Sequence, residues 1–193
     1  MRYAVFSDVH GNIDKLSKFF KECSNYSVEN YIFLGDIIHN GENYQENRCV
    51  DLVREKDCIA VKGNHDIINI KNKLTPENTK YLLKLPKLIG LGDLIIFHDT
   101  LVSEFYKSWN PERAKKEFQG LANYSGHIGL CGNSHYPFTY LRRDKSSIEK
   151  LDLSLIRLLN NSNYFINPGA LINSDYGVLD LENNEFVFLK LGN

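Results

Sequence analysis

Polar side chains that can bind metal ions follow five separate apolar runs of the sequence. Asp8 and His10 follow "AVFS", Asp36 follows "IFLG", Asn64, His65 and Asp66 follow "IAVKG", His98 follows "LIIF", and Asn133 and His135 follow "GLCG". Carboxylate, imidazole and amide donors without a thiolate suit Mn²⁺, Fe²⁺ or Zn²⁺ in an open catalytic site better than a cysteine-rich structural zinc. These residues are therefore candidate ligands of a catalytic metal centre.

Each motif also has a purely structural interpretation. Asp8-x-His10 can be a polar loop, Gly35-Asp36 is a common turn dipeptide, and Asn64 or Asp66 can cap a helix. The functional interpretation depends on convergence, because the carboxyl ends of strands in an open α/β sheet line one ligand crevice. Glycines adjoin nearly every motif and would let the backbone approach a bound phosphate: Gly11, Gly35, Gly63 and Gly132.

The elements that must position these residues alternate between strand and helix in the first half of the chain. Short apolar runs ending in turn residues predict strands, and apolar residues at helical spacing predict helices. Asn-Pro and Thr-Pro pairs predict helix starts at residues 110–111 and 75–76. The last quarter is mostly strand, with hairpin turns near 144–146 and 183–184. The residues alone thus predict an α/β sandwich of two or three layers with mixed strand order.

The bulk properties predict one intracellular domain over residues 1–193. A chain of 193 residues that is 42% hydrophobic can form one sizeable core. The net charge of −1, from 23 basic and 24 acidic residues, argues against nucleic-acid and membrane partners. Four scattered cysteines indicate free thiols of a reducing compartment, and no stretch has the length of a membrane span. We expect a cytoplasmic protein.

Taken together in order, the motifs resemble those of the calcineurin-like metallophosphoesterase superfamily. That series is D-x-H, G-D, G-N-H-[DE], a single His after a strand, and G-H-x-H. It stands here as "SDVHGN", "LGDII", "KGNHD", "IIFHD" and "CGNSHYP", followed by "INPGAL" as in small prokaryotic members. The resemblance implies a four-layer αββα sandwich of two facing mixed β-sheets. It also implies a phosphoesterase related to small prokaryotic phosphodiesterases and diadenosine tetraphosphatases.

The resemblance further implies two divalent ions, Mn, Fe or Zn, and a role for each matching residue. The first ion would be held by Asp8, His10, Asp36 and His135, and the second by Asp36, Asn64 and His98, with Asn133 offering a further oxygen to the second. Asp36 would bridge the ions, and a bridging hydroxide would attack phosphorus. His65 would be the general acid, oriented by Asp36 or Asp66, and the substrate would be a phosphomonoester, a phosphodiester or a nucleotide.

The sequence departs from this pattern at Asn133, where the family has histidine. An amide oxygen is a weaker ligand than imidazole for a borderline metal, so we expect the second ion to bind less tightly. The alternative function is a catalytically impaired scaffold that binds a protein partner.

Residues around the motifs give further expectations. Asn12, His39 and Asp66 are candidate substrate contacts, although His39 can equally be a solvent-exposed loop residue. Asp99 is a candidate for orienting His98, and residues 99–126 are a candidate cover over the substrate, with most of their basic and aromatic side chains structural.

Overall fold

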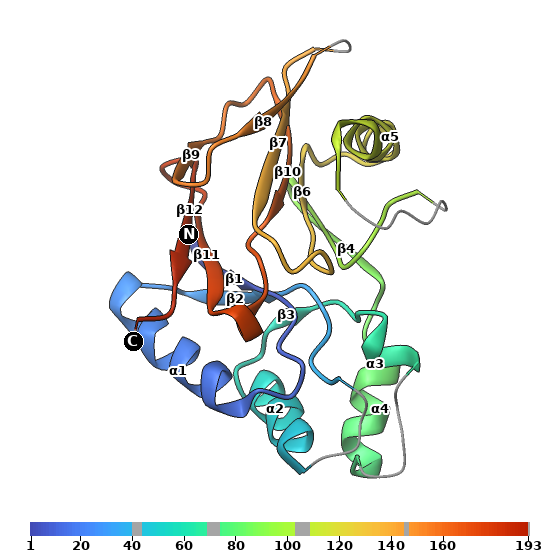
Figure 1. Ribbon diagram of the computed structural model, residues 1–193, viewed down its shortest axis with the longest axis vertical. Coiled ribbons are helices and arrows are strands. Elements are labelled where there is room, and N and C mark those ends of the chain that lie inside the picture. Colours follow the sequence, from blue (N-terminus) through green and yellow to red (C-terminus); the bar gives the residue numbers. More distant parts are fainter. Residues whose placement is uncertain (40–43, 69–73, 103–108, 145–146, 193) are drawn as a thin grey trace.

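The computed structural model describes residues 1–39, 44–68, 74–102, 109–144 and 147–192. Its strands form two six-stranded sheets, and helices lie on the outer face of each (Figure 1). The order of layers is therefore helix, sheet, sheet, helix. This confirms the αββα fold with two mixed sheets, whereas the two or three layers predicted from the residues alone were too few.

The first sheet has the strand order β3-β2-β1-β11-β12-β9. Strands β1, β2 and β3 run parallel to one another, and the other neighbours pair antiparallel. In chain order its strands are β1 (Arg2–Phe6), β2 (Asn30–Phe33), β3 (Ile59–Ala60), β9 (Leu155–Arg157), β11 (Asp175–Asp180) and β12 (Glu185–Lys190).

The second sheet has the strand order β4-β5-β6-β10-β7-β8. Strands β5, β6 and β10 run parallel, and the hairpins β4–β5 and β7–β8 are antiparallel. Its strands are β4 (Leu88–Leu91), β5 (Leu94–Phe97), β6 (Ile128–Leu130), β7 (Phe138–Arg142), β8 (Ile148–Leu151) and β10 (Asn163–Asn167).

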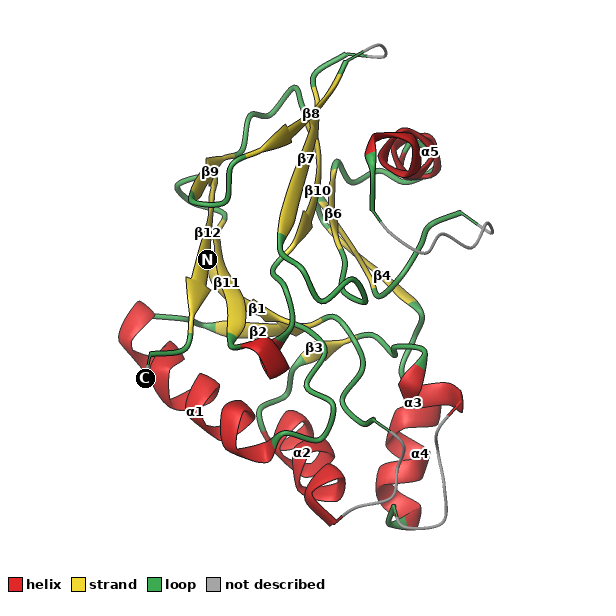
Figure 2. Ribbon diagram, viewed as in Figure 1, coloured by secondary structure: helices red, strands yellow, loops and turns green. Residues whose placement is uncertain are grey.

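The helices separate into two groups (Figure 2). The first group covers the β1–β3 side of the first sheet and comprises α1 (Ile13–Cys23), α2 (Tyr44–Glu55), α3 (His65–Ile68) and α4 (Pro76–Lys84). Helix α5 (Pro111–Leu121) lies alone beside the second sheet, and two short 3₁₀ turns cover Ser24–Tyr26 and Leu171–Asn173. None of the helices described is long and apolar enough to cross a membrane.

The alternating direction of side chains along each strand explains why the fold has three apolar layers. In β1, Ala4 and Phe6 face the helices, whereas Tyr3 and Val5 face the other sheet. In β5, Leu94 and Ile96 face the first sheet, and Ile95 and Phe97 face α5. Successive side chains of a strand point to opposite faces, so a run that is apolar throughout is buried on both.

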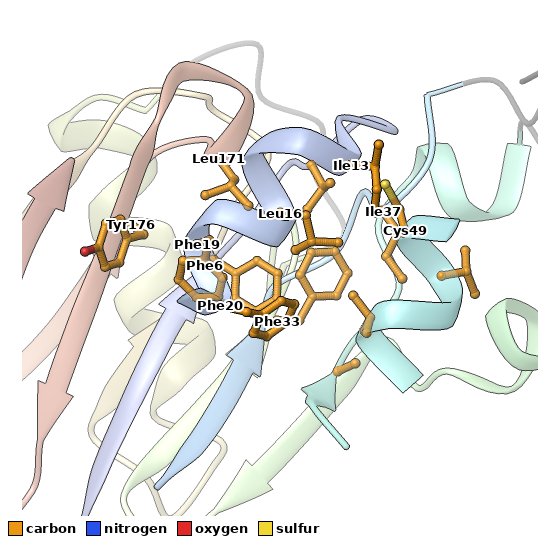
Figure 3. Close-up of a cluster of buried hydrophobic side chains, with 14 of the residues drawn as sticks. Phe6, Ile13, Leu16, Phe19, Phe20, Phe33, Ile37, Cys49, Leu171 and Tyr176 are labelled. Atoms are coloured by element: carbon orange, nitrogen blue, oxygen red, sulfur yellow. The ribbon is translucent and has the colours of Figure 1, made fainter. Parts of the chain in front are cut away.

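The helix-facing layer of the first sheet centres on Phe6 (Figure 3). The Phe6 ring lies 4.5 Å from Phe19, 5.8 Å from Phe20 and 4.9 Å from Phe33, measured between ring centroids. Phe19 and Phe20 belong to α1 and Phe33 to β2. The cluster therefore joins the first helix to the two strands that lead into the metal-ligand loops.

Most element positions agree with those predicted from the sequence. The side chains of Thr75 and Asn110 cap α4 and α5 by accepting the amide hydrogens of Asn78 and Arg113. Helix α3 and strand β9 were not predicted as elements, because each spans only four or three residues. Short elements of this kind depend on tertiary contacts more than on local sequence preference.

Replacing Phe6 by alanine should remove the centre of this aromatic layer. We expect Phe6→Ala to lower the free energy of unfolding by about 3–5 kcal/mol, because a large side chain that is 0% exposed leaves a cavity. Urea denaturation measures the change. Leu83→Ala is the control, because Leu83 is 58% exposed and its truncation should change stability by less than about 0.5 kcal/mol. Equal losses in the two variants would contradict this account of the core.

Candidate metal centre

The predicted site residues lie at the carboxyl ends of strands from both sheets. Loops after β1, β2 and β3 carry Asp8, His10, Asp36 and Asn64, and loops after β5 and β6 carry His98, Asn133 and His135. The two sheets meet there through Nδ1 of His98, after β5, which donates at 2.6 Å to the carbonyl of Leu34, after β2. Residues up to 127 positions apart in the chain thus form one site.

The first group of converging atoms comes from Asp8, His10 and His135. The Nε2 atoms of His10 and His135 are 3.1 Å apart. Oδ1 of Asp8 lies 3.3 Å from the His135 nitrogen and 3.8 Å from the His10 nitrogen. Asp8 is fully buried, and this oxygen has no hydrogen-bond partner among the described residues. A buried carboxylate oxygen that faces two imidazole nitrogens is a position that a cation would satisfy.

The second group centres on Asp36 and His98. Oδ2 of Asp36 lies 3.2 Å from Nε2 of His98 and 3.9 Å from Nε2 of His10. Oδ1 of Asn64 lies 3.1 Å from the same His98 nitrogen. Nδ1 of His98 donates to the Leu34 carbonyl at 2.6 Å, which turns Nε2 towards Asp36. One oxygen of Asp36 therefore faces both groups.

The donor set fits metal ions. The groups Asp8–His10–His135 and Asp8–Asp36–His98 each have ligand atoms within 4.8 Å of one another. Imidazole and carboxylate donors match borderline divalent ions, and the Leu34 carbonyl is the kind of outer partner that fixes a metal-binding imidazole.

Opposite charges control protonation at these side chains. Burial lowers the pKa of His98, but the charge and hydrogen bond of Asp36, the charge of Asp8 and the Leu34 carbonyl together outweigh it and raise the pKa of His98 to about 10. Burial raises the pKa of Asp36, but the charge and hydrogen bond of His98, the His65 amide and the charge of His10 together outweigh it, so the net shift is downward. Burial lowers the pKa of His10, and the neighbouring Asp8 raises the pKa of His135. Binding of a metal ion by His98 therefore requires the loss of its proton.

Five site residues have left-handed backbone conformations. Their φ angles are 54° for Asp8, 47° for His10, 60° for Asp36, 64° for Asn133 and 58° for His135. Such a conformation costs a non-glycine residue roughly 1–2 kcal/mol. Strain of this kind persists where the surrounding structure over-determines the backbone, which is common at functional sites.

A buried carboxylate holds two of the strained loops together. Asp66 is 0% exposed, and its two oxygens accept the amide hydrogens of Asp36, Ile37, Ile38 and Gly63 at 2.9–3.3 Å. Burial and the charge of Asp36 raise the pKa of Asp66 to about 6, against the effect of the amide donors. This burial does not fit the expectation that Asp66 contacts substrate or orients His65. Its carboxylate instead fixes the loops after β2 and β3.

Close backbone approach in the same region requires glycine. A Cβ atom at Gly63 would lie 2.0 Å from Oδ1 of Asp36, and one at Gly35 would lie 2.7 Å from both the Gly63 amide nitrogen and Nδ1 of His98. Distances below 3.0 Å are not tolerated, so any side chain at either position would displace Asp36 or His98.

His65 and His39 lie beside the first group. The amide of His65 donates to Oδ1 of Asp36 at 2.9 Å, and its Nδ1 donates to the His39 carbonyl at 2.7 Å. The His39 and His65 rings are stacked with centroids 5.3 Å apart. Asp36, the first of the two predicted partners, therefore contacts His65 through the His65 backbone, and the His39 carbonyl orients the ring.

Sequence reasoning missed Glu46, which supports the His39 loop. Glu46 is 0% exposed on α2, and its Oε1 accepts the His39 amide hydrogen at 2.7 Å. Its side chain also packs against Gly11, where a Cβ atom would lie 2.7 Å from Cγ of Glu46. The available signal was its spacing, because Glu46 precedes the buried Cys49, Val50 and Val53 on one helix face.

Two other residues expected at the site, Asn12 and Asp99, have structural contacts. Asn12 caps α1, with its Oδ1 accepting the amide hydrogen of Lys15 at 3.0 Å. Asp99 does not orient His98 as expected, because it pairs with Nη2 of Arg113 at 2.9 Å. Arg113 in turn lies over the ring of Trp109. The described part of the predicted cover therefore contains a packed cluster, and residues 103–108 of that segment lie outside the described residues.

Asn133 joins the site through its backbone. Its amide donates to Oδ2 of Asp8 at 3.1 Å, and its side chain is half-buried. The loop is held by Asn167, whose Nδ2 donates to the Gly132 carbonyl at 2.6 Å.

Comparison with known proteins gives consistent matches. A family model described as calcineurin-like phosphoesterase matches residues 1–187. An uncharacterised protein of Methanocaldococcus jannaschii is 29% identical over 192 residues, covering 87% of this chain and 75% of that protein. A metallophosphoesterase from Sphaerobacter thermophilus superposes with a TM-score of 0.82 at 23% identity, covering 100% of this chain and 89% of that one. An archaeal phosphodiesterase superposes with a TM-score of 0.59 at 15% identity, covering 99% and 100%.

Replacing Asp66 by asparagine tests its structural role. The change removes the charge and turns an N–H₂ group towards backbone N–H donors, so we expect the free energy of unfolding to fall by at least about 2 kcal/mol. Urea denaturation in the presence of a chelator measures this without any contribution from bound metal. Asp51→Asn, at a side chain that is 49% exposed, is the control and should change stability by less than about 0.5 kcal/mol. An Asp66→Asn protein as stable as the wild type would rule out the proposed role.

Proposed function

Because the chain belongs to the calcineurin-like phosphoesterase family, we propose that it hydrolyses a small phosphoester with two divalent ions bound at the strand ends. The observation that carries the proposal is the position of Asp36. Its Oδ2 lies within 4 Å of an imidazole nitrogen in each ligand group, His10 on one side and His98 on the other. A carboxylate between two ligand groups is what a two-metal site requires.

The proposed ligands follow from these two groups. The first ion is assigned to Asp8, His10, Asp36 and His135, and the second to Asp36, Asn64, His98 and Asn133. When bound, such ions supply Lewis-acid activation of the phosphoryl group and of the attacking water. Mn²⁺ is the first ion to test, because oxygen donors make up half or more of the assigned ligands.

His65 is the proposed general acid. Its Nδ1 donates to the His39 carbonyl, so Nε2 is the nitrogen that exchanges a proton with the leaving-group oxygen. The backbone of His65 is bound to Asp36, which ties the position of the acid to the metal centre. A proton donor held in one orientation next to the reacting group is the arrangement that general acid catalysis requires.

The proposed substrate is a phosphomonoester, a phosphodiester or a nucleotide. The His39 side chain is exposed beside His65 and is the proposed substrate contact. Asn12 and Asp66 are proposed to act indirectly, since one caps α1 and the other is buried beneath the loops.

Leaving-group dependence tests the role of His65. We expect the wild type to hydrolyse 4-nitrophenyl phosphate or bis(4-nitrophenyl) phosphate with Mn²⁺ and to lose activity with a chelator. His65→Asn should lower kcat by about 10²–10⁴-fold for an alkyl ester, whose leaving group needs a proton, and much less for a nitrophenyl ester. Steady-state kinetics on matched alkyl and nitrophenyl esters measures the difference.

Two variants serve as references for this experiment. His127→Asn should behave as the wild type, because His127 lies outside the site and pairs with Asp93. Asp36→Asn should lose activity on every ester. A wild-type protein that binds no divalent ion and hydrolyses neither ester would reject the enzyme in favour of a partner-binding scaffold. Equal losses of His65→Asn on alkyl and nitrophenyl esters would reject His65 as the acid.

Asn133→His should restore a stronger ligand for the second ion. We expect the affinity for the more weakly bound Mn²⁺ to rise at least about tenfold, because imidazole replaces an amide oxygen. His135 has a φ of 58° in the same loop, so the backbone accommodates histidine in this conformation. Isothermal titration of the metal-free protein measures both affinities.

The control for this variant is Asn123→His, which adds a histidine in the exposed turn after α5. It should leave both affinities unchanged. If Asn133→His also leaves them unchanged, Asn133 does not ligate the second ion.

A further inference from the structure

Three imidazole rings, two from the loops after β1 and β2 and one from the first residue of α3, meet at the edge of the metal centre. His10, His39 and His65 each offer a nitrogen atom within 4.8 Å of the others. The centroid of the His10 ring lies 5.4 Å from that of His39 and 4.9 Å from that of His65. The His39 and His65 rings are stacked with their centroids 5.3 Å apart. We call these residues the three-histidine group. Its composition differs from the two ligand groups described above, because it contains no carboxylate.

This composition selects the kind of ion. Imidazole donors suit Zn²⁺, Cu²⁺ and Ni²⁺, whereas Mn²⁺ and Mg²⁺ depend on oxygen ligands. Three protein imidazoles with an open fourth position are an established zinc geometry. The three-histidine group should therefore bind Zn²⁺ and discriminate against Mn²⁺.

Backbone atoms of His39 fix its loop and orient the His65 ring. The His39 amide donates to Glu46, and the His39 carbonyl accepts from Nδ1 of His65. The loop position is therefore set by backbone atoms of His39, and its exposed ring stacks on the ring of His65. A substitution of the His39 side chain keeps both of these hydrogen bonds.

We infer that the three-histidine group is an additional, inhibitory zinc site that overlaps the metal centre at His10. His10 belongs to both this group and the Asp8–His10–His135 group, and His65 is the proposed general acid. Zn²⁺ in the three-histidine group would compete for His10 and occupy His65, so it would oppose hydrolysis in two ways. The zinc-binding part stands on geometry alone, and the inhibitory part rests on the proposed function.

Zinc binding is tested first, with no reference to activity. The protein is saturated with Mn²⁺ and titrated with Zn²⁺ against a chromogenic chelator, with bound metals counted after dialysis. Because Zn²⁺ can also displace Mn²⁺ from the carboxylate groups, the informative quantity is the difference between wild type and His39→Asn. We expect the affinity for one zinc ion per chain to be at least about tenfold lower in His39→Asn than in the wild type. His127→Asn, a matched change away from the group, should bind zinc as the wild type does.

Inhibition is tested second, as the ratio of Mn²⁺-dependent rates with and without Zn²⁺ for each protein. We expect zinc to lower the rates of the wild type and of His127→Asn. At the same zinc concentrations, the ratio of the His39→Asn rates with and without zinc should stay near one. Equal zinc binding by wild type and His39→Asn would overturn the site. His39-dependent binding with equal sensitivity of all three rates would overturn the inhibitory role. A protein with His39-dependent zinc binding and no hydrolysis would instead overturn the proposed function and leave the zinc site standing.

Discussion

The site depends on one buried carboxylate that accepts four backbone amides. Asp66 binds the amides of Asp36, Ile37 and Ile38 after β2 and that of Gly63 after β3. Through Gly63 it also sets the start of α3, and hence the place of His65. The interaction uses charge-assisted hydrogen bonds in a region without solvent, where they are strong and where an unpaired partner is costly. The candidate ligand side chains are thus positioned by a buried residue that is not itself among the proposed ligands.

The same principle explains how strained ligand residues are tolerated. Val9 and His10 donate their amides to the Asp36 carbonyl, so the loops after β1 and β2 constrain each other. Asn133 donates to Asp8 and links a loop of the second sheet to one of the first. These residues with left-handed backbone conformation are thus hydrogen-bonded to a neighbouring loop, which is in turn hydrogen-bonded to another. Strain is therefore distributed over a network and not absorbed by one weak turn.

Much of this could be predicted from the sequence because the ligands follow apolar runs directly. Asp8, Asp36 and His98 each come one to three residues after a strand, and strand ends converge by topology. The number of layers could not be predicted from runs such as "LIIF", because full burial does not reveal what lies on each side. The roles of Glu46 and Asp66 were also hidden, since a carboxylate that binds distant backbone amides has no local pattern.

The division of the centre between two sheets has a consequence for how this protein can diverge. Asp36 comes from one sheet and His98 from the other, and the apolar layer between the sheets sets their separation. Side chains such as Val61 and Ile96, which are 0% exposed to solvent, therefore set the spacing of the two halves of the centre. Amino-acid substitutions in this layer should be limited to residues of equal volume, whereas the layer under α5 can accept substitutions more freely. Selection on chemistry would then act on the interior as strongly as on the ligands.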